Sequence, residues 1–292
     1  GSALQETGTH GTVREVEIPA EIDGYRVISV AEEAFRGNRA LRSVKTEGSL
    51  QIASHAFAEC PQLSEFDFEG VTEIGSYAFM SCTSLTKVHS STVRSVGTSA
   101  FLDCTSLTSV QFTDEAGVPL TLSPYAFGGC SSLRFVTLDR AQGDGNGWYA
   151  AFGNSYGVEE LYLRSLGRDG VASVPELFSD DPSRMGLRTL TVGEMDAIPE
   201  FFCRGMKNLE RVTVETLYEG TVGTSAFDGC ISLTTLDLGR TVETVGSRAF
   251  RDTAIASFDG NRLTSLGEGA FSGCSSLRTV GFTQDTPLTF LA

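Results

Sequence analysis

The chain has 292 residues, of which 40% are hydrophobic and 20% are charged, a composition typical of a folded domain rather than of a disordered segment. Its formal net charge of −15 repels phosphate backbones and anionic headgroups, so we expect no nucleic-acid partner. No apolar run reaches the roughly 20 residues that a membrane-spanning helix needs, so no membrane insertion is expected. No signal peptide is present; Gly1-Ser2 reads as a remnant of an expression vector, and we expect that a native leader was removed.

A motif of Ala-Phe, then Cys three residues later, then Leu recurs along the chain, as in "GSYAFMSCTSL" (75–85) and "GTSAFDGCISL" (223–233). The repeat phenylalanines follow one another at about 24 residues, a period typical of a solenoid in which every coil presents the same apolar residues to its neighbours. These phenylalanines, or their nearest equivalents, are Phe35, Phe57, Phe79, Phe101, Phe127, Phe152, Phe178, Phe202, Phe227, Phe250 and Phe271.

A second motif, Leu-x-x-Val-x-Phe, runs in phase with the first and predicts a strand. In "LSEFDF" (63–68), Phe66 and Phe68 alternate with Glu65 and Asp67, which is the period-2 pattern of a half-buried strand. Strands repeated once per coil stack in parallel about 4.8 Å apart. No gap is long enough for a linker, so we expect residues 1–292 to form one solenoid domain of about 11–12 coils.

The other half of each unit, as in "VTEIGSYAFMSC" (71–82), contains an apolar pair, a glycine break and one or two expected helical turns. Ser123-Pro124 fits a helix N-cap followed by proline at the first helical position, and Pro175 and Pro199 match Pro124. We therefore predict an α/β solenoid with a parallel sheet on the concave side and short helices or turns on the convex side.

The unit "VTEIGSYAFMSCTSLTKV" (71–88) resembles the BspA-type leucine-rich repeat, also called the Treponema pallidum-type leucine-rich repeat. The resemblance covers nearly the whole chain. It implies a right-handed solenoid, commonly in secreted or surface-anchored bacterial proteins, some of which bind host matrix proteins such as fibronectin and fibrinogen. The chain lacks the Asn ladder of the common leucine-rich repeat, and it is irregular in residues 139–206, where Cys203 is displaced. The resemblance does not identify a ligand.

The cysteines and histidines give no sign of metal or catalytic chemistry. The repeat cysteines are 22 or more residues apart, unlike a C-x-x-C metal site, and we predict buried free thiols. His10, His55 and His89 are scattered, and no catalytic or phosphate-binding motif occurs. We therefore predict no enzymatic activity, no metal and no cofactor. The seven cysteines are Cys60, Cys82, Cys104, Cys130, Cys203, Cys230 and Cys274.

If the Val and Phe of each strand point inward, the residues between them line the concave surface. The N-terminal third of this surface is acidic, the middle carries aromatic residues and arginines, and the C-terminal third is rich in Thr and Ser. Aromatic residues and arginine are the usual anchors of interfaces, although a sheet also exposes whatever side chains are tolerated there. An acidic cluster of Glu65, Asp67 and Glu69 could hold a cation, but a solvated face is the simpler interpretation.

The segment "DRAQGDGNGWYAAFGNSYG" (139–157) is the strongest local departure from the repeat. It contains the only tryptophan of the chain, Trp148, beside Tyr149, and its extra residues predict a loop. "DGNG" faintly resembles a calcium loop but lacks the later ligands. Two interpretations stay open: a recognition loop, or a lengthened turn with Trp148 packed over the core.

These observations favour a secreted or cell-surface bacterial protein that binds a host or bacterial surface protein, or a glycan, through its concave face and the 139–157 loop. The alternative is a structural spacer or assembly module without a ligand of its own. The oligomeric state stays open. The candidate ligand-binding residues are Lys87, His89, Phe135, Trp148, Tyr149, Tyr162, Arg164 and Arg211.

Overall fold

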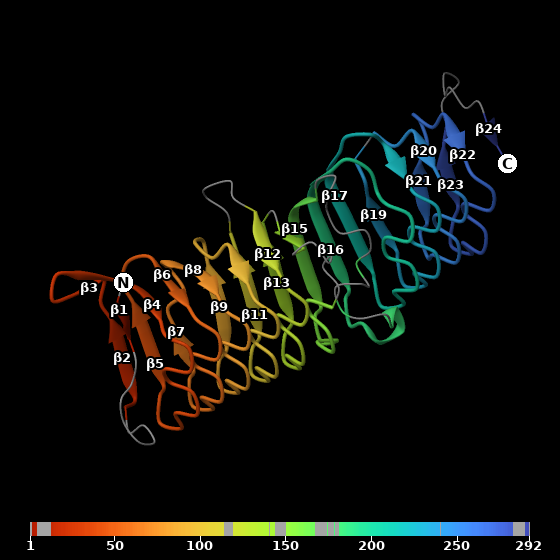
Figure 1. The fold of residues 1–292 in the computed structure, drawn as a ribbon. Coiled ribbons are helices and arrows are strands. Elements are labelled where there is room, and N and C mark those ends of the chain that lie inside the picture. Colours follow the sequence, from red (N-terminus) through yellow and green to blue (C-terminus); the bar gives the residue numbers. More distant parts are fainter. Residues whose placement is uncertain are drawn as a thin grey trace. The chain divides into compact units, whose positions relative to one another are not determined.

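The computed structural model describes residues 2–4, 13–113, 119–139, 141–143, 150–166, 174, 178, 181–239, 241–282 and 290–291. The chain divides into two compact units, Gly1–Val158 and Glu159–Ala292, and each is described by itself. Both consist of β-solenoid coils (Figure 1). The described residues form about ten of them, close to the predicted 11–12. One continuous domain over residues 1–292 stays a prediction.

In the first unit, the Leu-x-x-Val-x-Phe motifs form parallel strands along one side of the coils (Figure 1). The alternation is as predicted: in β9 (Lys87–Ser90), Val88 and Ser90 are buried while Lys87 and His89 are exposed. Strands β9, β11 and β13 pair in register, so each buried valine lies beside its equivalent in the next coil. The strands on this side are β2 (Glu15–Ile18), β5 (Ser43–Thr46), β7 (Glu65–Phe66), β9, β11 (Ser109–Phe112) and β13 (Phe135–Leu138).

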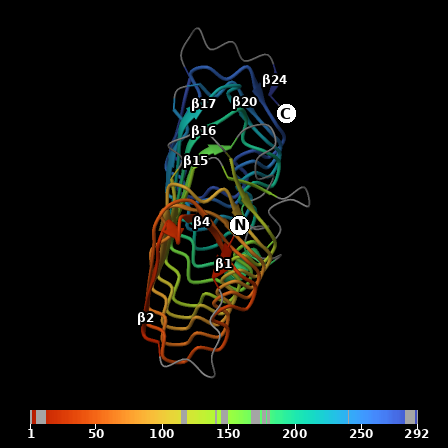
Figure 2. The same ribbon diagram turned by 60° about the vertical axis from the view of Figure 1, so that its left-hand side comes forward.

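The apolar pair in the other half of each unit, which was not predicted as a strand, forms a strand in the structure. These strands make up a second parallel sheet. Figure 2 looks along the coils of this unit and shows β2 and β4 on different sides of the coil. The glycine after β8 permits the close approach of coils: Gly75 N donates to Ile52 O at 2.8 Å, and a Cβ on Gly75 would lie only 2.7 Å from Ser54 N. The strands are β1 (Ser2–Leu4), β4 (Tyr25–Val30), β6 (Leu50–Ile52), β8 (Val71–Ile74), β10 (Ser95–Val96), β12 (Leu120–Leu122) and β14 (Ala141–Gly143).

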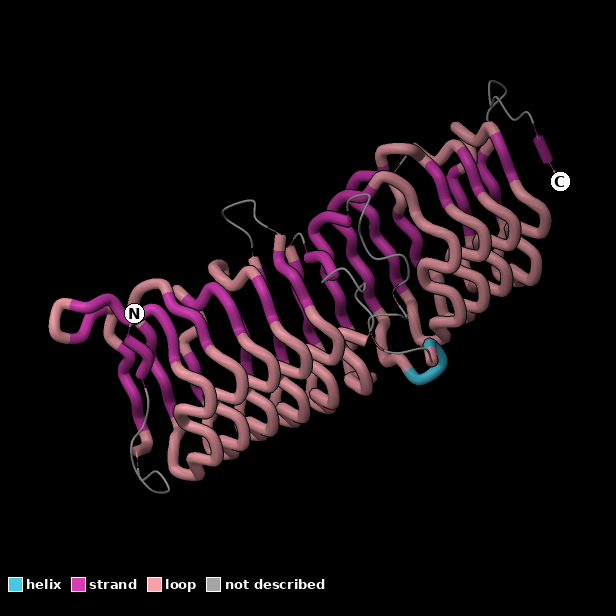
Figure 3. The backbone as a smooth tube through the Cα atoms, viewed as in Figure 1, coloured by secondary structure: helices cyan, strands magenta, loops and turns pink. Residues whose placement is uncertain are grey.

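The segments that carry Ala-Phe form stacked turns, so the expected short helices are wrong (Figure 3). Tyr77 and Ser81 bracket Phe79 with left-handed φ angles of 58° each, which interrupts any helix. Phe79 N donates to Ala100 O of the next coil at 2.7 Å, whereas an α-helix would keep this bond within the segment. The same left-handed pairs recur in the other coils, most of them at residues other than glycine.

Ser123-Pro124 therefore begins a turn and caps no helix. The one helix in the described part of the chain is the short 3₁₀ helix η2 (Pro182–Arg184), in which the Asp181 side chain accepts a hydrogen bond from Ser183 N. Of the two other prolines that were aligned with Pro124, Pro175 lies outside the described residues and Pro199 immediately precedes a turn.

The second unit repeats the same architecture. Strands β15 (Glu160–Leu166), β16 (Thr189–Met195), β17 (Arg211–Leu217) and β19 (Thr235–Asp237) pair in parallel and in register. A second set is formed by β18 (Thr221–Val222), β20 (Thr244–Val245), β22 (Ser265–Leu266) and β24 (Phe290–Leu291), and a third pair by β21 (Ser257–Asp259) and β23 (Thr279–Gly281).

A column of stacked phenylalanine rings fills the turn side of the core, as the repeat predicts. Phe101 is fully buried, with ring centroids 5.1 Å from Phe79 and 4.9 Å from Phe127 and interplanar angles of 4° and 3°. In the second unit, Phe227 and Phe250 stack at 5.5 Å. Each buried ring contributes about 1.5–3 kcal/mol from burial, and each ring pair about 0.5–1.5 kcal/mol more.

The contacts of the repeat cysteines explain why cysteine occupies this position. All seven thiols are free, as predicted, and all but that of Cys274 are buried. Cys82 Sγ donates to Phe57 O of the preceding coil at 3.1 Å, and Cys104 Sγ donates to Phe79 O at 3.2 Å. Cysteine is small, apolar and still a weak donor, so it fills the gap and partners a buried carbonyl. Where serine takes this place, Ser155 Oγ makes the equivalent bond to Phe127 O at 2.7 Å.

The repeat register at residues 201–206 differs from the sequence alignment by one residue. Cys203 N donates to Ala226 O in the same way that Phe227 N donates to Ala249 O of the next coil. Cys203 therefore occupies the phenylalanine position, and Phe202, which the sequence analysis placed there, occupies the alanine position. This shift explains why Cys203 appeared displaced.

Candidate functional site

The outward side chains of three strands in the first unit form a continuous surface, which we call the β9–β13 face. It consists of the outward residues of β9, β11 and β13, and strand pairing sets Lys87 beside Ser109 and Ser109 beside Phe135. A second row runs parallel to the first, from His89 to Gln111. Three of the predicted ligand-binding residues, Lys87, His89 and Phe135, are thereby brought onto one sheet.

Lys87 and His89 give one end of the face its charge. Lys87 is exposed and has no ion-pair partner among the residues that the structure describes. His89 Nε2 lies 2.9 Å from Ser109 Oγ, within hydrogen-bonding distance. Partial burial, and secondarily the charge of Lys87, hold the pKa of His89 below its ordinary value. The imidazole is therefore mostly neutral at neutral pH, and Lys87 supplies the fixed positive charge.

Phe135 gives the other end of the face its apolar character. Its side chain is 49% exposed, whereas Val136 beside it is 2% exposed. Because side chains alternate along a strand, Val136 points inward and Phe135 points outward. Lys87 and Phe135 lie two strands apart in the same row, which corresponds to about 10 Å.

The acidic strand β7 borders this face on the N-terminal side. The outward residues Glu65 and Asp67 are exposed, but the Asp67 carboxylate accepts a hydrogen bond from Glu69 N at 3.0 Å, and the Glu69 carboxylate accepts from Ser91 N at 3.1 Å. The described residues contain no group of three or more His, Cys, Asp or Glu side chains placed to hold a metal ion. Asp67 and Glu69 of this cluster accordingly accept hydrogen bonds from backbone amides of their own chain.

The second unit contains three further predicted residues. Arg211 on β17 is exposed, lies in register between Thr189 and Thr235, and has no ion-pair partner within the described part of the chain. Tyr162 on β15 is half-buried, and Arg164 on the same strand is exposed. These side chains point outward from one sheet, as the alternation predicts.

Trp148 and Tyr149 lie outside the described residues, so the recognition-loop and packed-turn interpretations both stay open. The segment 139–157 rejoins the repeat at Phe152, which was predicted as a repeat phenylalanine. Its C-terminal part belongs to the repeat, because Phe152 is fully buried and stacks on Phe127 at 5.4 Å. At its N-terminal end, β14 extends the second sheet by pairing with β12.

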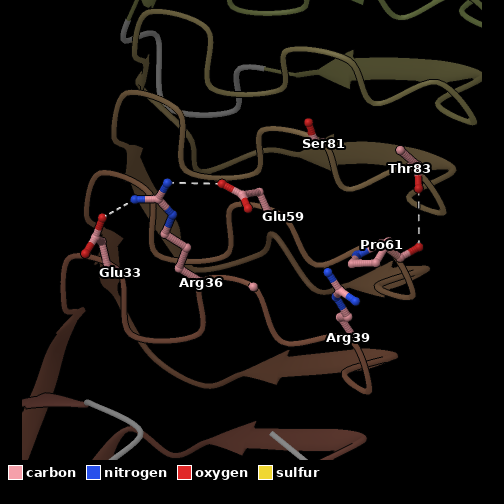
Figure 4. A pocket seen from close by; sticks show the side chains of 8 residues that line it. Glu33, Arg36, Arg39, Glu59, Pro61, Ser81 and Thr83 are labelled. Carbon is pink, nitrogen blue, oxygen red and sulfur yellow. Dashed lines mark hydrogen bonds and ion pairs between the residues drawn. The ribbon is translucent and has the colours of Figure 1, made fainter. Parts of the chain in front are cut away.

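A groove of about 1000 Å³ lies on the turn side of the first coils and was missed by the sequence analysis (Figure 4). Arg36 bridges Glu33 and Glu59, and these hydrogen bonds raise the pKa of Arg36. Arg39, also on the groove, has no ion pair among the described residues. The Glu33-x-x-Arg36 spacing was the available signal. The lining is Glu33, Arg36, Gly37, Arg39, Glu59, Pro61, Ser81 and Thr83.

Two exposed tyrosines were also missed. Tyr25 is 70% exposed and pairs with Ile22 across the hairpin of β3 (Glu21–Ile22) and β4, which turns at Asp23-Gly24 with φ angles of 53° and 80°. The Asp-Gly dipeptide was the sequence signal for this hairpin. Tyr218 is 63% exposed, and its hydroxyl donates to Glu194 Oε2 at 3.0 Å.

Stacked coils with two parallel strand columns and a column of phenylalanine turns define a leucine-rich-repeat β-solenoid. The family model described as "BspA type Leucine rich repeat region" matches residues 12–134 and 196–289 in six copies. The chain therefore belongs to the BspA-type leucine-rich repeat family, as its resemblance implied. No curated protein matches the sequence.

The chain is also similar to several solved structures. A leucine-rich cell surface protein of Faecalibacterium prausnitzii shares 16% identity over 96% of this chain and 92% of that chain, with a TM-score of 0.37. The T. pallidum leucine-rich repeat protein shares 21% over 92% and 79%, with a TM-score of 0.37. An internalin of Listeria monocytogenes shares 11% over 94% and 88%, with a TM-score of 0.41. Similarities this low say nothing about the ligand. In the described residues, no helix is long and apolar enough to cross a membrane.

Proposed function

We propose that this protein is a secreted or cell-surface bacterial binding protein that recognises a protein or a glycan through the outward faces of its parallel strands, together with the segment 139–157. The observation that carries the proposal is Phe135, an aromatic ring 49% exposed within a regular sheet whose inward residues are fully packed. The sheet already holds the backbone of this residue in place, so a ligand can contact the ring at a small cost in conformational entropy.

Charge supports the same function in each unit. Lys87 and Arg211 are outward cations without ion pairs among the described residues. Arginine and aromatic side chains dominate the binding energy of interfaces. We propose binding, and no catalytic role, for these surfaces.

The test is binding of the purified protein to immobilised fibronectin, fibrinogen and mucin and to arrayed glycans, measured by biolayer interferometry. Three variants locate the surface: Phe135→Ala in the first unit, Arg211→Glu in the second, and a triple variant with Trp148, Tyr149 and Tyr162 changed to alanine. Loss of an interface anchor costs about 2 kcal/mol or more, so the responsible variant should weaken binding by about 30-fold.

Circular dichroism melting curves of the variants provide the folding control. Binding that survives all three variants would show that the ligand uses another surface, such as the turn-side groove. Absence of binding across the whole panel would contradict the proposal and favour the spacer or assembly module as the function.

A further inference from the structure

The β9–β13 face lacks the acidic character of the chain as a whole. The chain has 37 acidic and 22 basic residues, yet no acidic side chain projects outward from these three strands. The face is therefore neutral to positive on a protein of net charge −15. Its outward residues are Lys87, His89, Ser109, Gln111, Phe135 and Thr137.

The cationic end of the face, on β9, and its aromatic end, on β13, are separated by the neutral polar side chains of β11. Ser109 and Gln111 on β11 lie between the cationic strand β9 and the aromatic residue on β13. The row from Lys87 to Phe135 spans about 10 Å, a distance that three residues of an extended peptide cover. Hydroxyl and amide groups in the middle of the row can pair with the polar backbone of such a peptide.

We propose that the β9–β13 face binds an acidic, aromatic-containing segment of a partner protein, with its carboxylates against Lys87 and His89 and an apolar side chain over Phe135. This inference rests on the proposed binding function and names the partner chemistry. Charge complementarity carries it: a basic segment would be drawn instead to the neighbouring strand β7 with Glu65 and Asp67. The same two carboxylates keep an acidic segment from shifting toward β7.

The geometry also makes binding dependent on pH. His89 is faced by Lys87 on its own strand and by Ser109 and Gln111 on β11. On the side of β7 lie the exposed carboxylates of Glu65 and Asp67, the second of which accepts a hydrogen bond from Glu69 N. Below the pKa of His89 the ring becomes a second cation beside Lys87. Because a bound carboxylate stabilises the protonated ring, affinity should rise as the pH falls from 7.5 to 5.5. An exposed charge pair corresponds to a gain of about two- to fivefold.

The probes are three fluorescent 12-residue peptides that alternate Asp with Phe, Asp with Ser, or Lys with Phe. Fluorescence anisotropy with the full chain should give a Kd of about 10–100 μM for the Asp–Phe peptide at pH 7.5, typical of a small interface. The Asp–Ser and Lys–Phe peptides should bind at least tenfold more weakly. Lys87→Glu and Phe135→Ala should each weaken binding of the Asp–Phe peptide by about tenfold.

The matched control is Lys45→Glu on β5, an equally drastic charge reversal at an outward position whose lysine lies 3.8 Å from Glu17. It should leave the affinity of the Asp–Phe peptide within about twofold. His89→Gln should abolish the gain at pH 5.5 without weakening binding at pH 7.5 by more than about twofold.

Equal binding of the Lys–Phe and Asp–Phe peptides, or equal losses in Lys87→Glu and Lys45→Glu, would overturn the inference. Failure of the peptide test can be distinguished from failure of the binding function. A protein that binds a panel ligand through Arg211 but ignores the Asp–Phe peptide keeps the proposed function and loses this partner.

Discussion

Replacing Phe101 by alanine tests whether the phenylalanine column holds the first unit together. The ring is fully buried and has a parallel neighbour on each side, Phe79 at 5.1 Å and Phe127 at 4.9 Å. A buried Phe→Ala change costs about 3–5 kcal/mol, and the loss of two stacked contacts puts this site at the upper end. We expect a loss of about 4–5 kcal/mol for Phe101→Ala. Phe101→Leu keeps most of the volume but loses both stacked contacts, so it should cost about 1–3 kcal/mol.

The matched control is Phe135→Ala, which removes the same atoms from the same unit at a position that is 49% exposed. Surface changes away from packed features cost about 0.5 kcal/mol or less, and the half-exposed ring should stay below about 1 kcal/mol. Urea unfolding followed by far-UV circular dichroism gives both values, provided that the slope with denaturant is unchanged. Similar losses for Phe101→Ala and Phe135→Ala would refute the reasoning, because Phe135 would then be packed and unavailable to a ligand.

Two further predictions concern the spacing of the coils and the thiols. Gly75→Ala places a methyl group 2.7 Å from Ser54 N and should cost about 1–3 kcal/mol in the same urea assay; an unchanged midpoint would mean that the coils can separate locally. Burial raises the pKa of Cys130 and Cys230 to about 12, so at pH 8 only about one thiol in 10,000 is ionised at each site. Maleimide labelling of the native protein followed by mass spectrometry should therefore modify the half-buried Cys274 first, and the others only after unfolding; early labelling of Cys130 would contradict the burial.

The fold was largely predictable because each coil buries the same residues. Periodicity located the strands of the first sheet and most of the phenylalanine column, since a solenoid repeats its core contacts at a fixed spacing. The second sheet was expected only as an apolar pair in each unit, because segments as short as Ser95–Val96 carry no periodic strand pattern of their own. The turn conformation was not predictable from this pattern. "SYAFMS" (76–81) has the length and apolar spacing of a helical turn. Tyr77 and Ser81 nevertheless adopt left-handed φ angles, which are uncommon for residues other than glycine and are rarely predictable from sequence.

The candidate surface was predictable in part. The strand alternation gave the outward direction of Lys87, His89 and Phe135, because a period of two leaves only two faces. The spacing of Glu33 and Arg36 was visible in the sequence, but the contact of Arg36 with Glu59 was not, since it depends on which residues of successive coils become neighbours. The one-residue shift at Cys203 arose in the same way, because hydrogen bonds between coils decide the register and the motif does not.

The outward positions carry the functional information for a physical reason. Inward residues are constrained by the equivalent residues of two neighbouring coils, so they indicate the fold and give almost no information about a ligand. Outward residues are free of this constraint, so their side-chain types can reflect a ligand. Phe135 is such a residue, and Lys87, two strands away, is a cation that no described neighbour neutralises. Either feature alone is compatible with a passive surface. A rigid sheet that holds both at a fixed separation, with no outward carboxylate between them, is complementary to a ligand that carries an acidic and an apolar group at the same separation.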